Sequence, residues 1–467
     1  MGGIFGVLLG GGVASIAYLL FWVRSRERMR LWQEAAKAVG MTDLAVSTYF
    51  GVETKLTGNV GPLQVTIEVY QRGKEEHGTR VIVGGLRHGP YDLTIRPEGL
   101  GSTIKKSLGE RELEVGDPAF DDVAYLQGAP ALVRAIFDQE TRRLAGRLLN
   151  GQLLVEGRLE TKTLKVRVSV SDGCLRLDIP ARLLDDTTRW LPAVLPSIVE
   201  VGRRLRRPDD LAARIAENTR SEKVRGVRLA NLRTLTTDYP RHAATREALL
   251  TSLYDESPSV KLHAAIALGP EGRNALVDLA SSDSPDTVVA RAITALGADF
   301  PGELAIERLR RASEAGRSAT ALACIEAVGR AGSASGIEAL AGALASAADE
   351  VAVAAARTLA ATAGDAAEPP LVAALEHESA VVRVAAAEGL GAVGSPRSVV
   401  SLRNAASAHT FDGALRRAAR QAIAEIKSRV TGASPGQLSL AADEPGRVSL
   451  VDDDQRGRVS LDSGEDA

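Results

Sequence analysis

The chain has 467 residues, of which 45% are hydrophobic and only 4% aromatic, and at this length two or three domains are expected. The formal net charge of −2 excludes a global basic field that would attract nucleic acid, so we expect no nucleic-acid partner. Two cysteines and six scattered histidines exclude a disulfide framework, and they indicate neither a metal site nor any other cofactor.

The chain opens with an uncharged segment, Ile4–Val23. As a helix, it would be about 30 Å long, which matches the hydrocarbon core of a bilayer. Four arginines follow it directly: Arg24, Arg26, Arg28 and Arg30. The positive-inside rule then places the rest of the chain in the cytoplasm. Since arginine also outnumbers lysine, as in GC-rich bacterial genomes, we expect a single-pass protein of the bacterial inner (plasma) membrane. A cleaved hydrophobic N-terminus is the alternative.

Small residues recur every four positions in this segment, at Gly2, Gly6 and Gly10. This spacing lets two transmembrane helices approach closely, so it suggests a homodimer. The alternative is that glycine is simply common in membrane helices.

Residues 24–207 mix strand-like and helix-like patterns without a regular βαβ alternation, which favours an α+β domain. Helices are predicted at Arg24–Val39, Ala129–Leu149 and Leu191–Arg206. The predicted strands are Val52–Leu56, Leu63–Tyr70, Arg80–Val83, Asp92–Arg96, Arg111–Val115, Val123–Leu126, Gln152–Glu156, Leu164–Val170 and Cys174–Ile179.

An acidic cluster in this domain, Asp117, Asp121 and Asp122, could form a metal or acid–base site. A junction with solvated carboxylates is the preferred interpretation, because no histidine or other ligand lies nearby. Residues 32–149, notably Gly116-Asp117 followed by Phe120-Asp121, resemble an uncharacterised bacterial domain found between membrane anchors and repeat arrays. That resemblance implies no activity.

From residue 208 to residue 430 the sequence repeats with a period near 30 residues. Five copies share apolar or small residues at positions i, i+4, i+5 and i+8, which is one face of an α-helix. Their final apolar residues are 28, 32, 31 and 31 positions apart, namely Leu268, Leu296, Val328, Leu359 and Leu390. A shorter apolar pattern lies between successive copies, so each unit is expected to be a helix–turn–helix pair, with seven pairs in total.

The copies that begin at Val260 and Val382 read Val-basic-x-x-Ala-Ala-x-x-Leu-Gly, and they resemble the HEAT family in its short bacterial form. The basic residue is missing in three of the five copies, so any ladder of stacked charges is expected to be incomplete. The resemblance implies a curved all-α solenoid with an extended binding surface and no particular chemistry. Cys324 occupies a core position of its copy.

Residues 431–467 form an acidic tail with net charge −5, from three arginines and eight acidic residues, and we expect it to be disordered. Within it the phrase G-x-[LV]-S-L occurs three times, starting at Gly436, Gly446 and Gly457. The copies are either a duplicated solubilising tail or three docking peptides. As docking peptides, their candidate partner-binding residues are Leu438, Leu440, Val448, Leu450, Val459 and Leu461.

Together these patterns predict a multidomain, membrane-anchored scaffold that recruits cytoplasmic proteins through the solenoid and the tail, and that is not an enzyme. The alternative is a membrane-associated enzyme with a catalytic α+β domain and repeats that position a protein substrate. A pocket with convergent titratable groups in the α+β domain would favour this alternative.

Overall fold

The structure is a computed structural model, and the predicted membrane segment lies outside its described part except for residue 23. Gly2, Gly6 and Gly10 lie outside it as well. Within the described residues, no helix has both the length and the apolar character needed to cross a membrane. The described residues are 23, 25–49, 52–72, 76–89, 92–97, 113–150, 154–155, 158–159, 167–180, 184–429, 438–440 and 448–450.

The chain forms two compact units, Met1–Ala264 and Ala265–Ala467. The division falls inside helix α10, Pro258–Leu268. The first unit therefore holds both the α+β domain and the first helices of the repeat region, and the second holds the remaining repeats.

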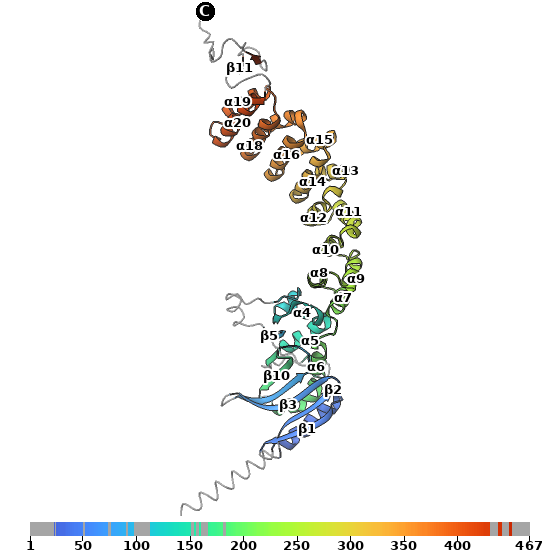
Figure 1. The fold of residues 1–467 in the computed structure, drawn as a ribbon. Helices are drawn as coiled ribbons and strands as arrows, with labels where there is room; N and C mark the ends of the chain where they lie inside the picture. Colours follow the sequence, from blue (N-terminus) through green and yellow to red (C-terminus); the bar gives the residue numbers. More distant parts are fainter. Residues whose placement is uncertain are drawn as a thin grey trace, which may run out of the picture. The chain divides into compact units, whose positions relative to one another are not determined.

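An eight-stranded sheet forms the centre of the first unit (Figure 1), and every neighbouring pair in it is antiparallel. The strand order is β1-β2-β3-β4-β10-β9-β5-β6. This all-antiparallel sheet with flanking helices agrees with the expected α+β class. The strands are β1 (Thr42–Tyr49), β2 (Val52–Val60), β3 (Leu63–Arg72), β4 (Glu76–Gly84), β5 (Leu93–Pro97), β6 (Ala124–Gly128), β9 (Arg167–Ser171) and β10 (Cys174–Pro180). A separate small pair is formed by β7 (Leu154–Val155) and β8 (Arg158–Leu159).

One face of the sheet is buried because apolar residues alternate along its strands, as with Val81 and Val83 in β4. The helix at residues 25–38 and α6 (Leu184–Leu205) are among the helices that contribute to this core. Trp32 of the first helix is buried. In α6, a Cβ added at Gly202 would lie 2.6 Å from a methyl group of Val83, so glycine lets this helix lie close to the sheet.

The other face of the sheet carries a row of alternating charges at directly paired positions. Lys55 of β2 faces Glu68 of β3, which faces Arg80 of β4, which faces Asp178 of β10. Arg80 donates to both carboxylate oxygens of Asp178, at 2.6 and 2.9 Å. Opposite charges at paired positions stabilise neighbouring strands, so the row favours this register over others.

The structure of the domain departs from the prediction in several places. Strand β1 was not predicted. The predicted helix Ala129–Leu149 is two helices, because Asp138 caps a new helix by accepting from the Thr141 N–H at 2.7 Å. No strand covers residues 113–115: the N–H of Leu113 donates to the carbonyl oxygen of Leu126, but the N–H of Val115 donates to the carboxylate of Asp121, so no regular ladder forms. The helices here are α3 (Pro118–Asp121), α4 (Pro130–Ile136) and α5 (Gln139–Leu149).

Residues 211–429, all of which are described, form fourteen α-helices that follow one another as seven helix pairs. In the first unit these helices are α7 (Leu211–Ser221), α8 (Arg225–Asp238), α9 (Ala243–Ser252) and the start of α10. In the second unit they are α11 (Arg273–Ser281), α12 (Asp286–Leu296), α13 (Gly302–Glu314), α14 (Ser318–Ala331), α15 (Ala334–Ala343), α16 (Asp349–Thr362), α17 (Glu368–Ala374), α18 (Ala380–Val393), α19 (Ser398–Ala408) and α20 (Gly413–Arg429).

The repeat positions expected from the sequence form the core of this helical region. In the copy carried by α18, Val382, Ala386, Ala387 and Leu390 are all fully buried. The same four positions are buried in α12, α14 and α16. In α10 the final residue, Leu268, is only half-buried. Within the second unit, α12, α14, α16, α18 and α20 pack successively against one another, so each repeat buries its apolar face against its neighbours.

The last three residues of the first two tail copies form short strands, where the sequence analysis expects disorder. Strand β11 (Leu438–Leu440) pairs antiparallel with β12 (Val448–Leu450). The physical reason is the short alternation of β-prone aliphatic residues around serine in each copy. The third copy lies outside the described residues.

Candidate functional site

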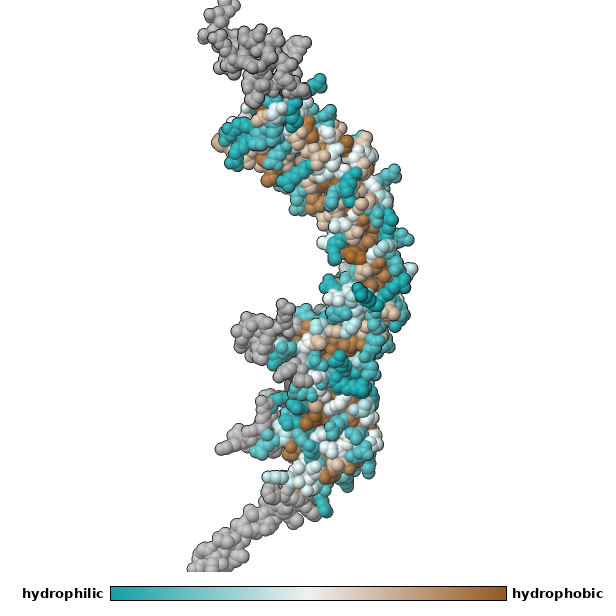
Figure 2. All heavy atoms as spheres, in the orientation of Figure 1, coloured by the Kyte–Doolittle hydropathy of each residue, from teal (hydrophilic) through white to brown (hydrophobic). Residues whose placement is uncertain are grey.

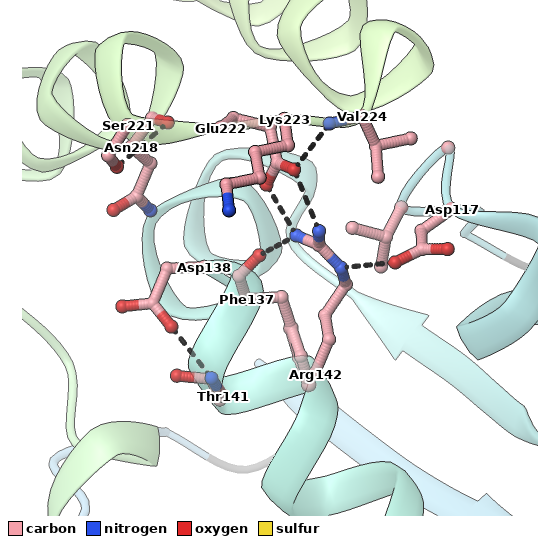
Figure 3. Close-up of polar contacts among 12 residues, drawn as sticks. Asp117, Phe137, Asp138, Thr141, Arg142, Asn218, Ser221, Glu222, Lys223 and Val224 are labelled. Carbon is pink, nitrogen blue, oxygen red and sulfur yellow. Dashed lines mark hydrogen bonds and ion pairs between the residues drawn. The ribbon is translucent and has the colours of Figure 1, made fainter.

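The first unit contains a buried ionic cluster at Arg142, on helix α5 (Figure 3). The guanidinium donates to both carboxylate oxygens of Glu222, at 2.8 and 2.9 Å, and to Asp117 at 2.8 Å. It also donates to the carbonyl oxygen of Phe137 at 2.9 Å. The side chains of Arg142 and Glu222 are only 2% and 1% exposed. This is therefore a desolvated, bidentate ion pair. Removing either partner would leave an uncompensated buried charge and cost several kcal/mol of stability.

Glu222 belongs to the turn between α7 and α8, the first helix pair of the repeat region. Its carboxylate also accepts from the backbone N–H of Val224 at 2.8 Å. Burial disfavours the charge of Arg142, but the bonds to Glu222 and Asp117 outweigh it and hold the pKa of Arg142 above its usual value. The ion pair thus joins the α+β domain to the first repeat.

Further polar contacts surround this ion pair, and together with it they define what we call the junction. Asn218 of α7 donates to the carbonyl oxygens of Arg134 and Ala135, both at 2.9 Å, and so satisfies two carbonyls at the end of α4. Arg214 of α7 donates to Asp138 at 2.8 Å. The junction consists of the side chains of Asp117, Asp138, Arg142, Arg214, Asn218 and Glu222.

At the junction the two backbones also meet at a pair of glycines. A Cβ added at Gly226 would lie 2.4 Å from the carbonyl oxygen of Gly116. Gly116 itself has φ of 94°, a conformation that favours glycine. The loop before α3 and the start of α8 therefore pack backbone to backbone, with no room for a side chain between them.

The predicted acidic cluster is divided among separate structural roles. Asp117 binds Arg142, whereas Asp121 accepts from the N–H groups of Val115 and Gly116 at 2.8 and 2.9 Å. Burial raises the pKa of Asp121, and these N–H groups oppose the shift. Asp122 is exposed. Among the described residues, no three histidine, cysteine or acidic side chains could together hold a metal ion.

An open hollow of about 620 Å³ lies beside the junction. Its rim includes Asp117, Phe120, Arg142, Arg143 and Arg147. Arg142 is ion-paired as described, and Arg143 pairs with Glu140 of the same helix. Of the charged side chains at this rim, Asp117, Arg142 and Arg143 are therefore engaged in ion pairs within the protein.

The predicted ladder of stacked charges has two similar rungs in the described structure. Arg228 of α8 and Arg383 of α18 each donate to the carbonyls five and six residues earlier. Arg228 also pairs with Asp255 at 2.7 Å, and Arg383 pairs with Asp412 at 3.1 Å. The rung at Arg228 belongs to an upstream copy that the sequence analysis did not align.

The surface of the second unit is mixed in polarity. Figure 2 shows hydrophilic and hydrophobic residues interspersed over its helices. Two aliphatic side chains, Leu322 and Val381, are 36% and 54% exposed, and Phe411 is fully exposed.

The two cysteines differ in accessibility. Cys324 of α14 is completely buried, and burial raises the pKa of its thiol to about 12, which keeps it protonated. This placement agrees with the expected core position. Cys174 of β10 is half-buried.

Of the six candidate docking residues in the tail, four lie in described strands. Leu438 pairs with Leu450, and Leu440 pairs with Val448. Val459 and Leu461 lie outside the described residues. The structure thus brings the first two copies together.

The sequence reasoning did not identify Arg142 or Glu222 as functionally placed residues. One signal was present for Arg142, since it shares the buried stripe of α5 with Ala145 and Leu149 at helical spacing. A charged residue in such a stripe needs a buried partner. The partner lies 80 positions away in another element, so spacing does not point to it.

Comparison with known proteins supports the repeats. The family described as HEAT repeats matches residues 337–424, and no curated protein matches the chain. A solved structure of human deoxyhypusine hydroxylase in complex with glycerol is 18% identical, with a TM-score of 0.21. The match covers 47% of this chain and 98% of that one.

The prediction that this chain is not an enzyme is corrected by that comparison. It was drawn from the repeats together with the lack of recognised catalytic and metal motifs, whereas the matched chain is named as an enzyme, and a fold by itself does not decide function. At this level of similarity the likeness assigns no reaction. The findings place HEAT repeats at residues 337–424, within a longer helical repeat region.

Proposed function

We propose that this protein is an interaction scaffold whose helical repeats bind other proteins. The observation that carries the proposal is the HEAT-repeat match at residues 337–424, within a region where successive helix pairs bury one another. Solenoids of this kind present extended surfaces for partners. The exposed aliphatic and aromatic side chains of the second unit, such as Val381 and Phe411, are candidate contact points.

We also propose that residues 4–23 anchor the chain in the bacterial plasma membrane as a single span. The arginines that follow this segment support a cytoplasmic location for the sheet domain and the repeats. A reporter that works only in the cytoplasm, fused after residue 467, should therefore be active. Activity of an alkaline-phosphatase fusion at the same position would show the opposite orientation.

The tail is proposed to contribute docking peptides to the same scaffold. Leu438 pairs with Leu450, and Leu440 pairs with Val448, in these strands. Two aliphatic residues at alternate positions of each copy suit an apolar groove on a partner, and the acidic residues after each copy suit a basic rim.

The test uses the full chain, tagged and extracted in detergent, with co-purified cytoplasmic proteins identified by mass spectrometry. Replacing Leu440, Leu450 and Leu461 together by serine should remove the partners that the tail holds. The matched control replaces the three central serines, Ser439, Ser449 and Ser460, by alanine and keeps the aliphatic residues. If the leucine variant keeps every partner, the tail does not dock. If the unmodified chain co-purifies no protein in larger amounts than an unrelated membrane protein used as control does, the scaffold proposal is wrong.

A further inference from the structure

Strand β1 lies at one edge of the eight-stranded sheet, and all eight of its residues are exposed. In the described part of the chain it pairs with β2 alone. The strand at the opposite edge, β6, has only five residues, and its first three are buried. The two edges therefore differ: β6 is short and covered, whereas β1 is long and open.

The sequence of β1 lacks the side chains that most often protect an open edge. Such strands commonly carry lysine or proline, which prevent pairing with another chain. In Thr42–Tyr49 the only charged residue is Asp43, at the beginning of the strand. Its carboxylate accepts hydrogen bonds from Thr42 and Asn59, both at 3.2 Å, so it is engaged within the chain. Leu44 and Val46 are each 40% exposed.

We propose that β1 pairs with β1 of a second copy of this chain, antiparallel and across a two-fold axis, so that the two sheets become one. An antiparallel edge is complementary to itself, because each strand offers the same alternating N–H and carbonyl groups. In such a pairing the two Asp43 side chains lie at opposite ends, so like charges do not face each other. A two-fold axis at Val46 places Asp43 opposite the neutral Tyr49 and pairs the neutral residues from Leu44 to Thr48 with one another.

The local geometry sets the length of this pairing. The register with β2 shifts between Thr42 and Ala45 and again between Ser47 and Thr48, so the regular part of β1 runs from Ala45 to Ser47. Bulges bend a strand, which confines the pairing to a short stretch centred on Val46. Gly58 of β2 allows the start of β1 to lie close, since a Cβ there would lie 2.7 Å from the carbonyl oxygen of Thr42.

The position of β1 in the chain also favours a second copy as its partner. Only a short turn separates it from the helix at residues 25–38, which follows the proposed membrane segment. Two copies anchored in one membrane would hold their β1 strands at similar distances from the membrane. This raises the effective concentration of one copy's β1 edge near that of the other copy. This argument rests on the proposed anchor, whereas the pairing itself needs only the edge.

The first experiment is oxidative cross-linking of the full chain in detergent, with Cys174 replaced by serine to remove the half-buried thiol. Val46→Cys should form a disulfide-linked dimer, because paired strands bring the two residues at the axis within disulfide reach. Ala38→Cys is the control, since residue 38 is exposed and lies at the end of the preceding helix but not on β1. Equal cross-linking of both variants, or of neither, contradicts the proposal.

The second experiment measures the mass of the protein–detergent complex by light scattering over a range of concentrations. Val46→Lys should raise the dimer dissociation constant at least about 100-fold, because it places two like charges together at the axis. Val46→Thr, which remains neutral and β-prone, should leave the constant unchanged. Ser47→Glu is a second disrupting variant. It should not unfold the chain, because Lys55, the cross-strand partner of residue 47 on β2, can offset the new charge.

A third variant separates β1 pairing from association through the membrane segment. If Gly6→Leu makes the protein monomeric while Val46→Lys and Ser47→Glu leave it dimeric, the small-residue row holds the dimer and the β1 proposal is wrong. A purified chain that is monomeric at all concentrations overturns it as well, and would leave the scaffold proposal unaffected. Dimers that survive Gly6→Leu and dissociate with both β1 variants support the pairing.

Discussion

Replacing Arg142 by methionine should destabilise the junction between the α+β domain and the first repeat by about 3–5 kcal/mol. The estimate follows from burial, because the change leaves the carboxylate of Glu222, only 1% exposed, without its cation. Methionine keeps most of the side-chain volume, so the cost is chiefly electrostatic. Removing the second charge as well, in Arg142→Met with Glu222→Met, should recover part of that stability, since a buried pair replaced by apolar residues is often tolerated.

The assay is hydrogen–deuterium exchange of the full chain, read from peptides that cover α4, α7 and the start of α8. A loss of about 3–5 kcal/mol would speed exchange through local opening by roughly two to four orders of magnitude. Arg143→Met is the matched control on the same helix. Arg143 is 43% exposed and pairs with Glu140, so its loss should cost no more than about 0.5 kcal/mol.

Two results would refute this reasoning. Exchange in α7 that is the same for Arg142→Met and Arg143→Met would mean that the buried pair does not hold the junction. A double variant that is less stable than Arg142→Met alone would mean that packing around Glu222, and not its charge, dominates.

Three further predictions concern the second unit. Leu390→Ala should cost about 2–5 kcal/mol and speed exchange in α16 and α20 as well as α18, whereas Val381→Ala, at an exposed position, should have little effect. Cys324 should resist alkylation at pH 8 in the folded protein, because burial raises its pKa to about 12, and labelling without denaturant would contradict its placement. The N–H of Leu415 and the guanidinium of Arg383 lower the pKa of Asp412, so this carboxylate stabilises α20 at neutral pH. That contribution should be lost as pH falls below about 4. In Asp412→Asn, the rate of hydrogen exchange in α20 should therefore change less with falling pH than in the unmodified chain.

The repeats were predictable because their signal is periodic. Val382, Ala386 and Leu390 recur in register with the other copies, and only a helix that stacks on similar helices buries all of these positions. The upstream copy containing Val227 and Arg228 escaped alignment because Asn231 stands where the other copies carry a small apolar residue.

The parts that were not predicted depend on contacts between distant residues. Strand β1 has no buried face, so the burial pattern that identifies a strand in sequence is missing there. The break between α4 and α5 had a local signal in Asp138 followed by Thr141, a pattern typical of a helix start, but the surrounding apolar residues suggested one continuous helix. The pairing of Arg142 with Glu222 joins residues 80 positions apart, and neither residue type indicates burial by itself.

The junction has a consequence for how such a chain can be rearranged by recombination. A crossover near residue 208 would bring α7 and α8 to a foreign N-terminal domain, with Glu222 and Asn218 still in place but without Arg142 and the end of α4. The hybrid would expose a carboxylate and an amide that this protein buries, and Gly226 would lose the backbone it packs against. The α+β domain and the first repeat are therefore expected to be inherited as one block, whereas the helix pairs beyond them can be gained or lost one at a time.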